Sequence, residues 1–236
     1  GILAGIAKFN LDSSGTIVAV ARNTLSGSSV GSLLSTDNGG GPGMDASSSS
    51  YYIHGNGGNG GSVSSNSSAM MLIGTYANTQ TTSGSSMSAN GLGGFSGGNF
   101  GVSNTASSFQ IGPGFRSDLA ELVYYNRGLS LQEQQRVLSY LAIKYGLQLA
   151  PSTLPNYLAS DGTVVWTHAS HGGYTSSIIG LGADATSGLN QKQSTTGQVL
   201  SIGLGSIAAD NASNTGSFVS DKSFLLVGNN GISSSL

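Results

Sequence analysis

One segment of the chain carries strand, turn and helix signals in unbroken order, at residues 118–146, DLAELVYYNRGLSLQEQQRVLSYLAIKYG. Residues 118–125 have the length and the aromatic and branched content of a β-strand, and residues 126–128 supply turn chemistry. Ser130 and Glu133 have the spacing of a capping box, in which each side chain pairs with an otherwise free amide at a helix start. We therefore expect a strand that is followed at once by a helix.

The expected helix has one apolar face. Its apolar side chains recur at helical spacing at Val137, Leu138, Leu141, Ala142 and Tyr145. Gly146 is suited to end the helix, because glycine adopts the left-handed conformation that a helix C-terminus requires. We expect the apolar stripe to be buried against a β-sheet.

The strand and helix together resemble the C-terminal end of laminin-G-like, concanavalin-A-like jelly-roll domains of large secreted and surface (adhesin-type) proteins of Gram-negative bacteria. The resemblance is carried by Asp118, Ala120, Glu121, Tyr125, Asn126, Arg127, Leu129, Ser130, Glu133, Tyr140, Leu141, Lys144, Tyr145 and Gly146. Residues 157–166 and 178–194 look like the module that commonly follows such a domain. The resemblance implies an all-β fold: an antiparallel β-sandwich with one short C-terminal helix, and then a smaller β-rich module.

The rest of the chain fits this organisation. Strand-like runs separated by Gly, Asn and Ser turns occur at residues 16–21, 51–54, 69–76, 108–111 and 119–125. Short strands with polar turns indicate an antiparallel sandwich. Pro151 and Pro155 flank a polar connector after the helix, so we expect the sandwich at residues 1–150 and the module at 151–236. We also expect the sandwich to lack its first strands and the module to be truncated at its C-terminal end.

Composition favours an extracellular or cell-surface protein. Only 8% of the residues are charged, against roughly 25% in an ordinary soluble domain, so solubility must come from hydroxyl, amide and glycine residues. Zero cysteines exclude disulfides, thiolate metal sites and a cysteine nucleophile. A net charge of -2 offers no basic face for nucleic acid, and no apolar run reaches the roughly 20 residues of a membrane-inserted helix.

The catalytic motifs in the chain lack the context that their chemistry needs. Gly55, Gly57 and Gly60 match G-x-G-x-x-G, but no helix start follows to bind a phosphate. The chain has only two glutamates, Glu121 and Glu133, and Glu133 belongs to the expected helix cap. A pair of carboxylates for glycoside cleavage is therefore not evident, and we expect no enzyme.

Two pairs of residues are candidates for binding. Relatives of the resembled fold often bind calcium at a loop edge, and Asp37 and Asp45 flank a glycine-rich loop that suits such a site. The same Asp-Asn-Gly sequence is also ordinary turn chemistry, so a purely structural turn stays open. Tyr51 and Tyr52 form a candidate sugar platform; as strand residues, one would instead point inward and the other outward.

The predicted function is a non-enzymatic extracellular module of a large bacterial surface or secreted protein, in adhesion or in surface-filament architecture. Its expected partners are other copies of itself or neighbouring domains of the same polypeptide, and surface glycans. The alternative is a calcium-dependent carbohydrate-binding module, and a diverged polysaccharide hydrolase ranks third. Glycan binding that a chelator abolishes would support the calcium-dependent alternative. Concentration-dependent polymerisation without glycan binding would support the predicted surface module.

Overall fold

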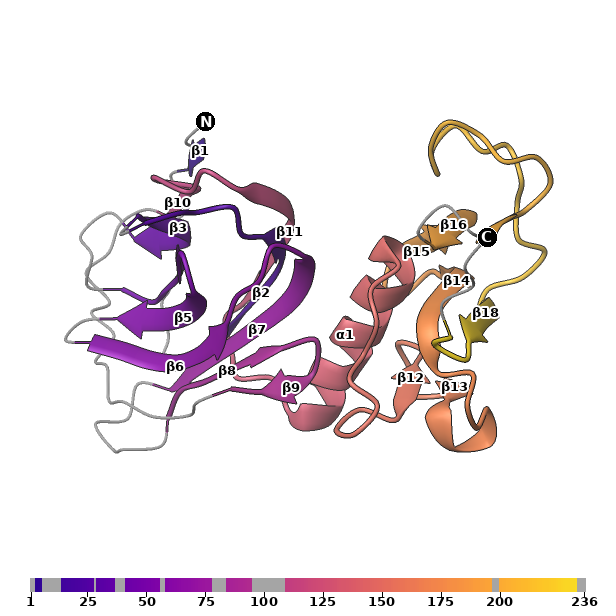
Figure 1. Ribbon diagram of the computed structural model, residues 1–236, viewed down its shortest axis with the longest axis horizontal. Helices are drawn as coiled ribbons and strands as arrows, with labels where there is room; N and C mark the ends of the chain where they lie inside the picture. Colours follow the sequence, from indigo (N-terminus) through magenta and orange to yellow (C-terminus); the bar gives the residue numbers. More distant parts are fainter. Residues whose placement is uncertain are drawn as a thin grey trace. The chain divides into compact units, whose positions relative to one another are not determined.

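The computed structural model describes residues 3–5, 14–27, 29–36, 41–55, 58–77, 84–94, 109–196 and 200–232. The chain divides into two compact units, Gly1–Ser130 and Leu131–Leu236. The strand pairs in both units are antiparallel, and the described residues contain one α-helix (Figure 1). The predicted all-β antiparallel fold with a single helix is confirmed.

The first unit consists of two sheets. The six-stranded sheet has the order β1-β10-β3-β4-β5-β6, with β1 (Leu3–Gly5), β10 (Phe109–Ile111), β3 (Val30–Thr36), β4 (Gly43–Ser47), β5 (Ser50–Gly55) and β6 (Gly58–Ser64). The five-stranded sheet has the order β11-β2-β7-β8-β9, with β11 (Asp118–Tyr125), β2 (Ser14–Arg22), β7 (Ala69–Ala77), β8 (Ser86–Ala89) and β9 (Leu92–Gly93). Sequence neighbours such as β3, β4, β5 and β6 form successive hairpins, as short strands with tight polar turns favour.

The two sheets bury one shared apolar core. Alternate side chains of each strand point into it, as the two-residue period of a β-strand requires. Its members from both sheets include Ile17, Ala19, Leu33, Met44, Tyr51, Ile53, Leu72, Tyr76 and Met87. These side chains are almost completely inaccessible to solvent, so the unit has the interior of a β-sandwich.

Gly74 in the middle of β7 makes room for this core. A Cβ atom at Gly74 would lie 2.8 Å from Cδ1 of Ile53 and 3.3 Å from both Cε of Met44 and Sδ of Met87. Glycine weakens a strand interior, yet here its missing side chain lets three large side chains meet.

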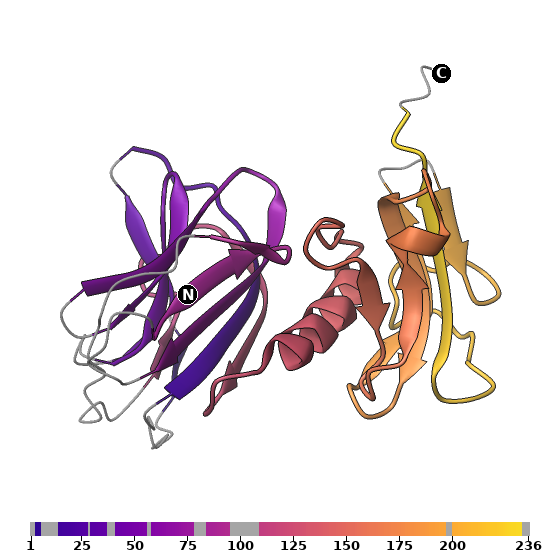
Figure 2. The same cartoon turned by 90° about the horizontal axis from the view of Figure 1, so that it is seen from below.

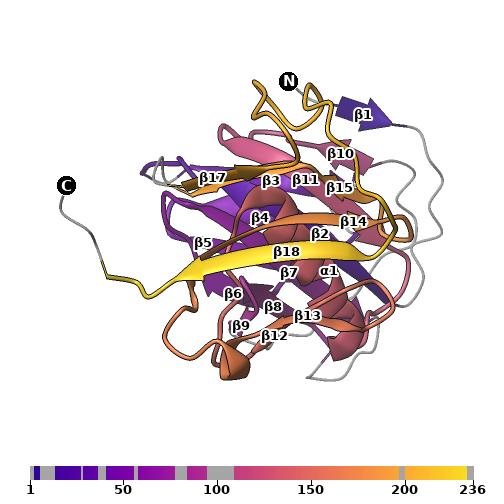
Figure 3. The same ribbon diagram turned by 90° about the vertical axis from the view of Figure 1, so that its right-hand side faces the viewer.

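The described residues of the second unit form the helix and seven strands. α1 (Leu131–Tyr145) is followed by the hairpin of β12 (Asn156–Leu158) and β13 (Val164–Thr167), and a 3-10 turn at His168–Ser170 follows β13. A three-stranded sheet has the order β15-β14-β18, with β14 (Ser176–Asp184), β15 (Leu189–Gln191) and β18 (Ser223–Asn229). β16 (Gln193–Thr196) pairs with β17 (Leu200–Gly203). Figure 3 shows β18 running beside β14, its hydrogen-bonded partner.

The helix packs within this unit against β12, β14 and β15 (Figure 2). Two hydrogen bonds add to the apolar contact: Oγ of Ser139 accepts the amide of Leu158 at 2.9 Å, and Nε2 of Gln135 donates to the carbonyl of Asn156 at 2.9 Å. Gly146, at φ +63°, ends the helix, and the amide of Leu147 donates to the carbonyl of Ala142. This is the glycine C-cap that the sequence predicts.

A buried carboxylate ties three parts of the second unit together. Asp184, at the end of β14, accepts hydrogen bonds from the amide of Ser160 at 2.8 Å and from its hydroxyl at 2.7 Å. Nζ of Lys222, just before β18, lies 3.4 Å from both Asp184 oxygens and donates to Oγ of Ser160 at 2.6 Å. The hydrogen bonds from Ser160 and Ser187 and the positive charge of Lys222 offset the cost of burial and hold the pKa of Asp184 below its ordinary value.

The structural division differs from the expected position. The chain divides into its compact units between Ser130 and Leu131, whereas we expected the domain boundary after residue 150 from the sequence. The reason lies in the helix contacts, because α1 packs on strands that follow it in the chain. Of the expected apolar stripe, Leu138 and Leu141 are buried, while Val137 and Tyr145 are partly exposed.

Replacing Gly74 with valine is expected to destabilise the first unit by about 1–3 kcal/mol, because the added atoms would overlap Ile53 and its neighbours in a close-packed core. Chemical denaturation monitored by circular dichroism measures the change. Gly93→Val in β9 is the matched control, since nothing lies within 4 Å of an added Cβ there. Equal stability of both variants would contradict the packing described for Gly74.

Candidate functional site

The outer face of the six-stranded sheet carries a row of polar side chains. On β4 and β5, Met44 and Ile53 point into the core, so Asp45 and Tyr52 point to solvent. Asp45 is opposite Ser32 of β3 on one side and Tyr52 on the other, and Tyr52 is opposite Ser62 of β6. The four partly exposed side chains Ser32, Asp45, Tyr52 and Ser62, with His54, are called the outer-face row below.

Asp45 is the centre of this row. Its Oδ1 lies 3.3 Å from Nε2 of His54, which stands two residues after Tyr52 on the same face. The side chains of Asp45 and His54 are only 14% and 16% exposed, so the pair is largely shielded from water. Burial raises the pKa of Tyr52, and the negative charge of Asp45 and the hydrogen bond that the Tyr52 hydroxyl donates to it raise the pKa further.

A glycine forms the floor beneath His54. Gly43 is the cross-strand partner of His54, and a Cβ at Gly43 would lie 2.2 Å from Nε2 of the imidazole. Nε2 and Cε1 of the ring therefore occupy the space that a side chain at position 43 would take, close to Asp45. His54 is not among the site residues that the sequence predicts. Its place opposite Gly43 is the signal for the contact, and this signal can be read only once the register of the two strands is known.

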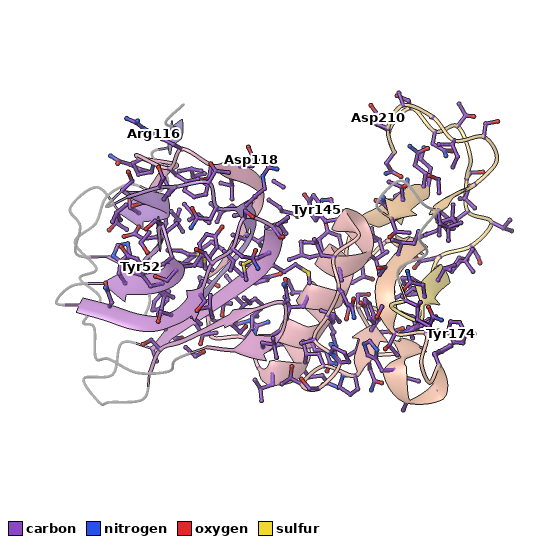
Figure 4. All side chains as sticks on the ribbon, viewed as in Figure 1. Tyr52, Arg116, Asp118, Tyr145, Tyr174 and Asp210 are labelled. Carbon is purple, nitrogen blue, oxygen red and sulfur yellow. The ribbon has the colours of Figure 1, made fainter. Side chains whose placement is uncertain are left out.

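The two candidate tyrosines lie on opposite faces. Tyr51 is 0% exposed in the sandwich core, and burial raises the pKa of its phenol. It cannot present its ring to a ligand on the surface, which corrects its assignment to a sugar platform. Tyr52 lies on the outer face, where Figure 4 labels it. The two tyrosines are therefore ordinary strand residues, of which Tyr51 points inward and Tyr52 points outward.

The proposed calcium pair is described only in part. Asp37 lies outside the described residues. Asp45 is on β4, with its carboxylate directed to Tyr52 and His54. Among the residues that the structure describes, no group of three or more His, Cys, Asp or Glu side chains could hold a metal ion. Calcium prefers six to eight oxygen ligands, and the described residues supply too few of them at Asp45, so the site depends on Asp37 and stays a prediction.

The other described carboxylates of the first unit lie on the opposite sheet. Asp118 of β11 accepts a hydrogen bond from Nε of Arg22 at 2.7 Å, and Glu121 is on the same strand. Figure 4 labels Asp118 and nearby Arg116 in this part of the unit. Asp45 thus has no second carboxylate beside it in the described part of the outer face. Of the G-x-G-x-x-G motif, Gly55 ends β5 and Gly60 lies in β6, and β5 and β6 pair with each other, so no helix start follows; Gly57 lies outside the described residues.

The remaining two histidines belong to the second unit. The imidazole of His171 stacks on the indole of Trp166, with ring centroids 3.7 Å apart and planes 9° from parallel, and Nδ1 of His171 lies 2.7 Å from the carbonyl of Thr167. His168 is 9% exposed, and neither of its ring nitrogens has a hydrogen-bond partner among the described residues. Burial, and then the nearby His171, lower the pKa of His168 below its ordinary value.

Comparison with known families and structures gives limited matches. A family model described as a domain of unknown function (DUF8202) matches residues 133–236, which include most of the helix and all later strands. No curated protein matches the chain. No helix within the described ranges has the length and hydropathy needed to cross a membrane.

Several solved structures are similar at low identity. One, on the cell entry of botulinum neurotoxin type C through two ganglioside molecules, has 10% identity and a TM-score of 0.44, and the match covers 59% of this chain and 38% of that chain. The binding domain of botulinum neurotoxin DC with rat synaptotagmin II has 8% identity, a TM-score of 0.45 and coverages of 66% and 40%. The sialidase of Trypanosoma rangeli has 18% identity, a TM-score of 0.33 and coverages of 50% and 21%. Structural similarity at such low sequence identities and TM-scores supports no conclusion about the ligand or activity of this chain.

The stability of the second unit is expected to fall on mild acidification because of His168. Its folded pKa is lowered, so the unfolded chain takes up the proton first, and stability is lost as the pH drops through the ordinary histidine pKa of about 6.5. Denaturation at about pH 7.5 and about pH 5.5, followed by the fluorescence of the sole tryptophan, Trp166, measures this loss. His168→Phe should reduce it.

His54→Gln is the control for this experiment, because His54 lies in the first unit and Trp166 reports on the second. It should leave the pH dependence of the Trp166 signal unchanged. An acid loss of the same size in His168→Phe and in the unsubstituted chain would show that buried His168 is not its source.

Proposed function

We propose that this chain is a non-enzymatic extracellular module of a large bacterial surface or secreted protein, in adhesion or surface-filament architecture, and that its outer-face row contacts surface glycans. The observation that carries the proposal is the row itself: hydroxyl, carboxylate and aromatic side chains from four neighbouring strands share one solvent face of the sandwich. A row across paired strands is an extended surface, which suits a chain-like ligand better than a small enclosed one.

The chemistry of the row supports a saccharide. The Tyr52 ring offers an apolar face to the C–H groups of a sugar, while its hydroxyl is oriented by Asp45. The hydroxyls of Ser32 and Ser62, which are partly exposed, can both donate hydrogen bonds to ligand hydroxyls and accept them. Because strand pairing and the contact between Asp45 and His54 fix these groups, little side-chain entropy is lost on binding.

The cellular setting follows from composition and resemblance. With 8% charged residues and no cysteine, the chain relies on neutral hydroxyl and amide groups for solubility. The strand and helix at residues 118–146 resemble the end of laminin-G-like domains of bacterial surface and secreted proteins. In such a protein the module would join copies of itself or neighbouring domains of the same polypeptide.

The arrangement of the carboxylates supports a non-enzymatic role. Glycoside cleavage needs two carboxyl groups on either side of the scissile bond. In the described part of the first unit, Asp45 lies on one sheet and Asp118 and Glu121 lie on the other. The outer-face row can therefore bind a glycan without the acid and base pair that cleavage requires.

Calcium-dependent carbohydrate binding is the second candidate. It is favoured by the place of Asp45, which puts a carboxylate beside Tyr52 on one face. Calcium bridging a sugar hydroxyl to Asp45, with Asp37 as a further ligand, would make glycan binding sensitive to chelators.

A glycan array probed with the full chain, with and without EDTA, tests the proposal. Glycan binding that persists in EDTA and falls about tenfold or more in Tyr52→Ala is expected, because truncation removes the stacking surface. Tyr174→Ala is the matched control, since Tyr174 is a 59% exposed tyrosine of the second unit.

The other outcomes separate the alternatives. Binding that EDTA abolishes supports the calcium-dependent module. Concentration-dependent polymerisation in light scattering without glycan binding supports filament architecture and rejects the outer-face row as a glycan site. Release of reducing sugars from a bound glycan would overturn the non-enzymatic assignment.

A further inference from the structure

The strand β18 forms one edge of the three-stranded sheet in the second unit. It pairs with β14 on one side (Figure 3), and among the described residues no other element shares a hydrogen bond with its backbone. β13 touches β18, but the strand that β13 pairs with is β12. In an antiparallel pair, alternate residues direct their N–H and C=O groups away from the partner strand. Every second residue of β18 therefore presents unpaired backbone groups along this edge.

The edge is apolar and reached by solvent. None of the seven residues of β18 is buried, whereas β14 beside it is buried throughout residues 178–182. Leu181 of β14 and Leu225 of β18 are cross-strand partners on one face, yet Leu181 is 3% exposed and Leu225 is 53% exposed. The cover that this face receives over β14 thus ends at β18.

The strand lacks the features that usually keep an edge from pairing with another chain. Edge strands of soluble proteins commonly carry a charge, a proline or a bulge. β11, an edge of the five-stranded sheet, has Asp118, Glu121 and an irregular register with β2. β18 has the sequence SFLLVGN, without a charged residue or a proline. Lys222 comes directly before it, but the ammonium group of Lys222 points to Asp184.

The sequence of β18 is complementary to itself. When two copies run antiparallel about a two-fold axis at Leu226, all seven residues find a partner. The facing pairs are then Leu226 with Leu226, Leu225 with Val227, Phe224 with Gly228, and Ser223 with Asn229. Branched apolar side chains meet, an aromatic ring covers a glycine, and polar side chains lie at both ends. Because the strand has no charge, this pairing brings no like charges together.

We propose that β18 is an interface strand, to which a second copy of this chain adds its own β18 antiparallel about a two-fold axis at Leu226. The two sheets then form one continuous sheet in the order β15-β14-β18-β18-β14-β15. The inference rests on the proposed function, whose partners include copies of this chain, and it identifies the surface through which they join. One strand pair buries less than the roughly 1,200 Å² of a standard interface, so the dimer is weak unless the copies are held close together.

Sedimentation equilibrium of the full chain, from about 10 µM to about 1 mM, tests the proposal. A reversible dimer with a Kd on the order of 100 µM is expected. Leu225→Lys should weaken the dimer about tenfold or more, because it places a charge against Val227 of the second copy. Leu92→Lys is the matched control and should leave the Kd unchanged, since Leu92 is a 51% exposed strand residue of the first unit.

A cysteine at the two-fold axis gives a second test, because the chain has no cysteine of its own. Residues directly opposite each other in an antiparallel pair have Cα atoms about 4.5–5.5 Å apart, which a disulfide can span. Leu226→Cys should therefore form a disulfide-linked dimer on oxidation. Leu92→Cys should stay monomeric under the same conditions.

A chain that stays monomeric at all these concentrations overturns the proposal. Protection of every β18 amide from hydrogen exchange in that monomer would show that other residues of the same chain cover the edge. A dimer that is unchanged in Leu225→Lys and does not cross-link through Leu226→Cys also overturns it, but leaves the self-association in the proposed function standing at another surface. Failure of the glycan array would reject the outer-face row and leave the β18 dimer untouched.

Discussion

Side chains alternate between the two faces of a β-strand, and in the first unit this alternation decides both the core and the candidate site. The demand for apolar burial directs Met44, Tyr51 and Ile53 inward, so their neighbours Asp45, Tyr52 and His54 lie on the opposite, outer face of the sheet. A slip of one residue in the register would expose the core and bury Asp45. The outer-face row is therefore held in place by the hydrophobic packing on the other side of the same strands.

Much of the fold could be predicted from the sequence wherever apolar content marked a strand. The runs that became β2, β5, β7 and β11 were expected, and so was the helix that ends at Gly146. The strand β6, with the sequence GNGGSVS, was not expected, because five polar or glycine residues in a row have low β-propensity. Its hairpin pairing with β5 supplies the stability that its own residues lack, and a strand that forms only because of its partner is not marked by the composition of its own residues.

The candidate site, too, could be predicted from the sequence only in part. Adjacent tyrosines in a strand must face opposite ways, but only the depth of the core shows that Tyr51 is the inward one. The contact between Asp45 and His54 joins residues on two strands, and it requires both the register of β4 with β5 and the missing side chain of Gly43. Sequence reasoning singled out Asp45 and Tyr52 for separate roles, calcium and sugar binding. The structure places them side by side.

The two units make polar surfaces by different physical means. In the first, backbone pairing across four strands sets the positions of the polar groups, so they form a row with the spacing of the sheet. In the second, an irregular loop is fixed by the side-chain amides of Gln193 and Asn211, which replace the backbone pairing that the loop lacks. Amides serve this purpose in a chain with so few charges because they satisfy buried donors and acceptors together without the desolvation cost of an ion. Where the second unit does bury a charge, at Asp184, it surrounds the carboxylate with Ser160 and Lys222.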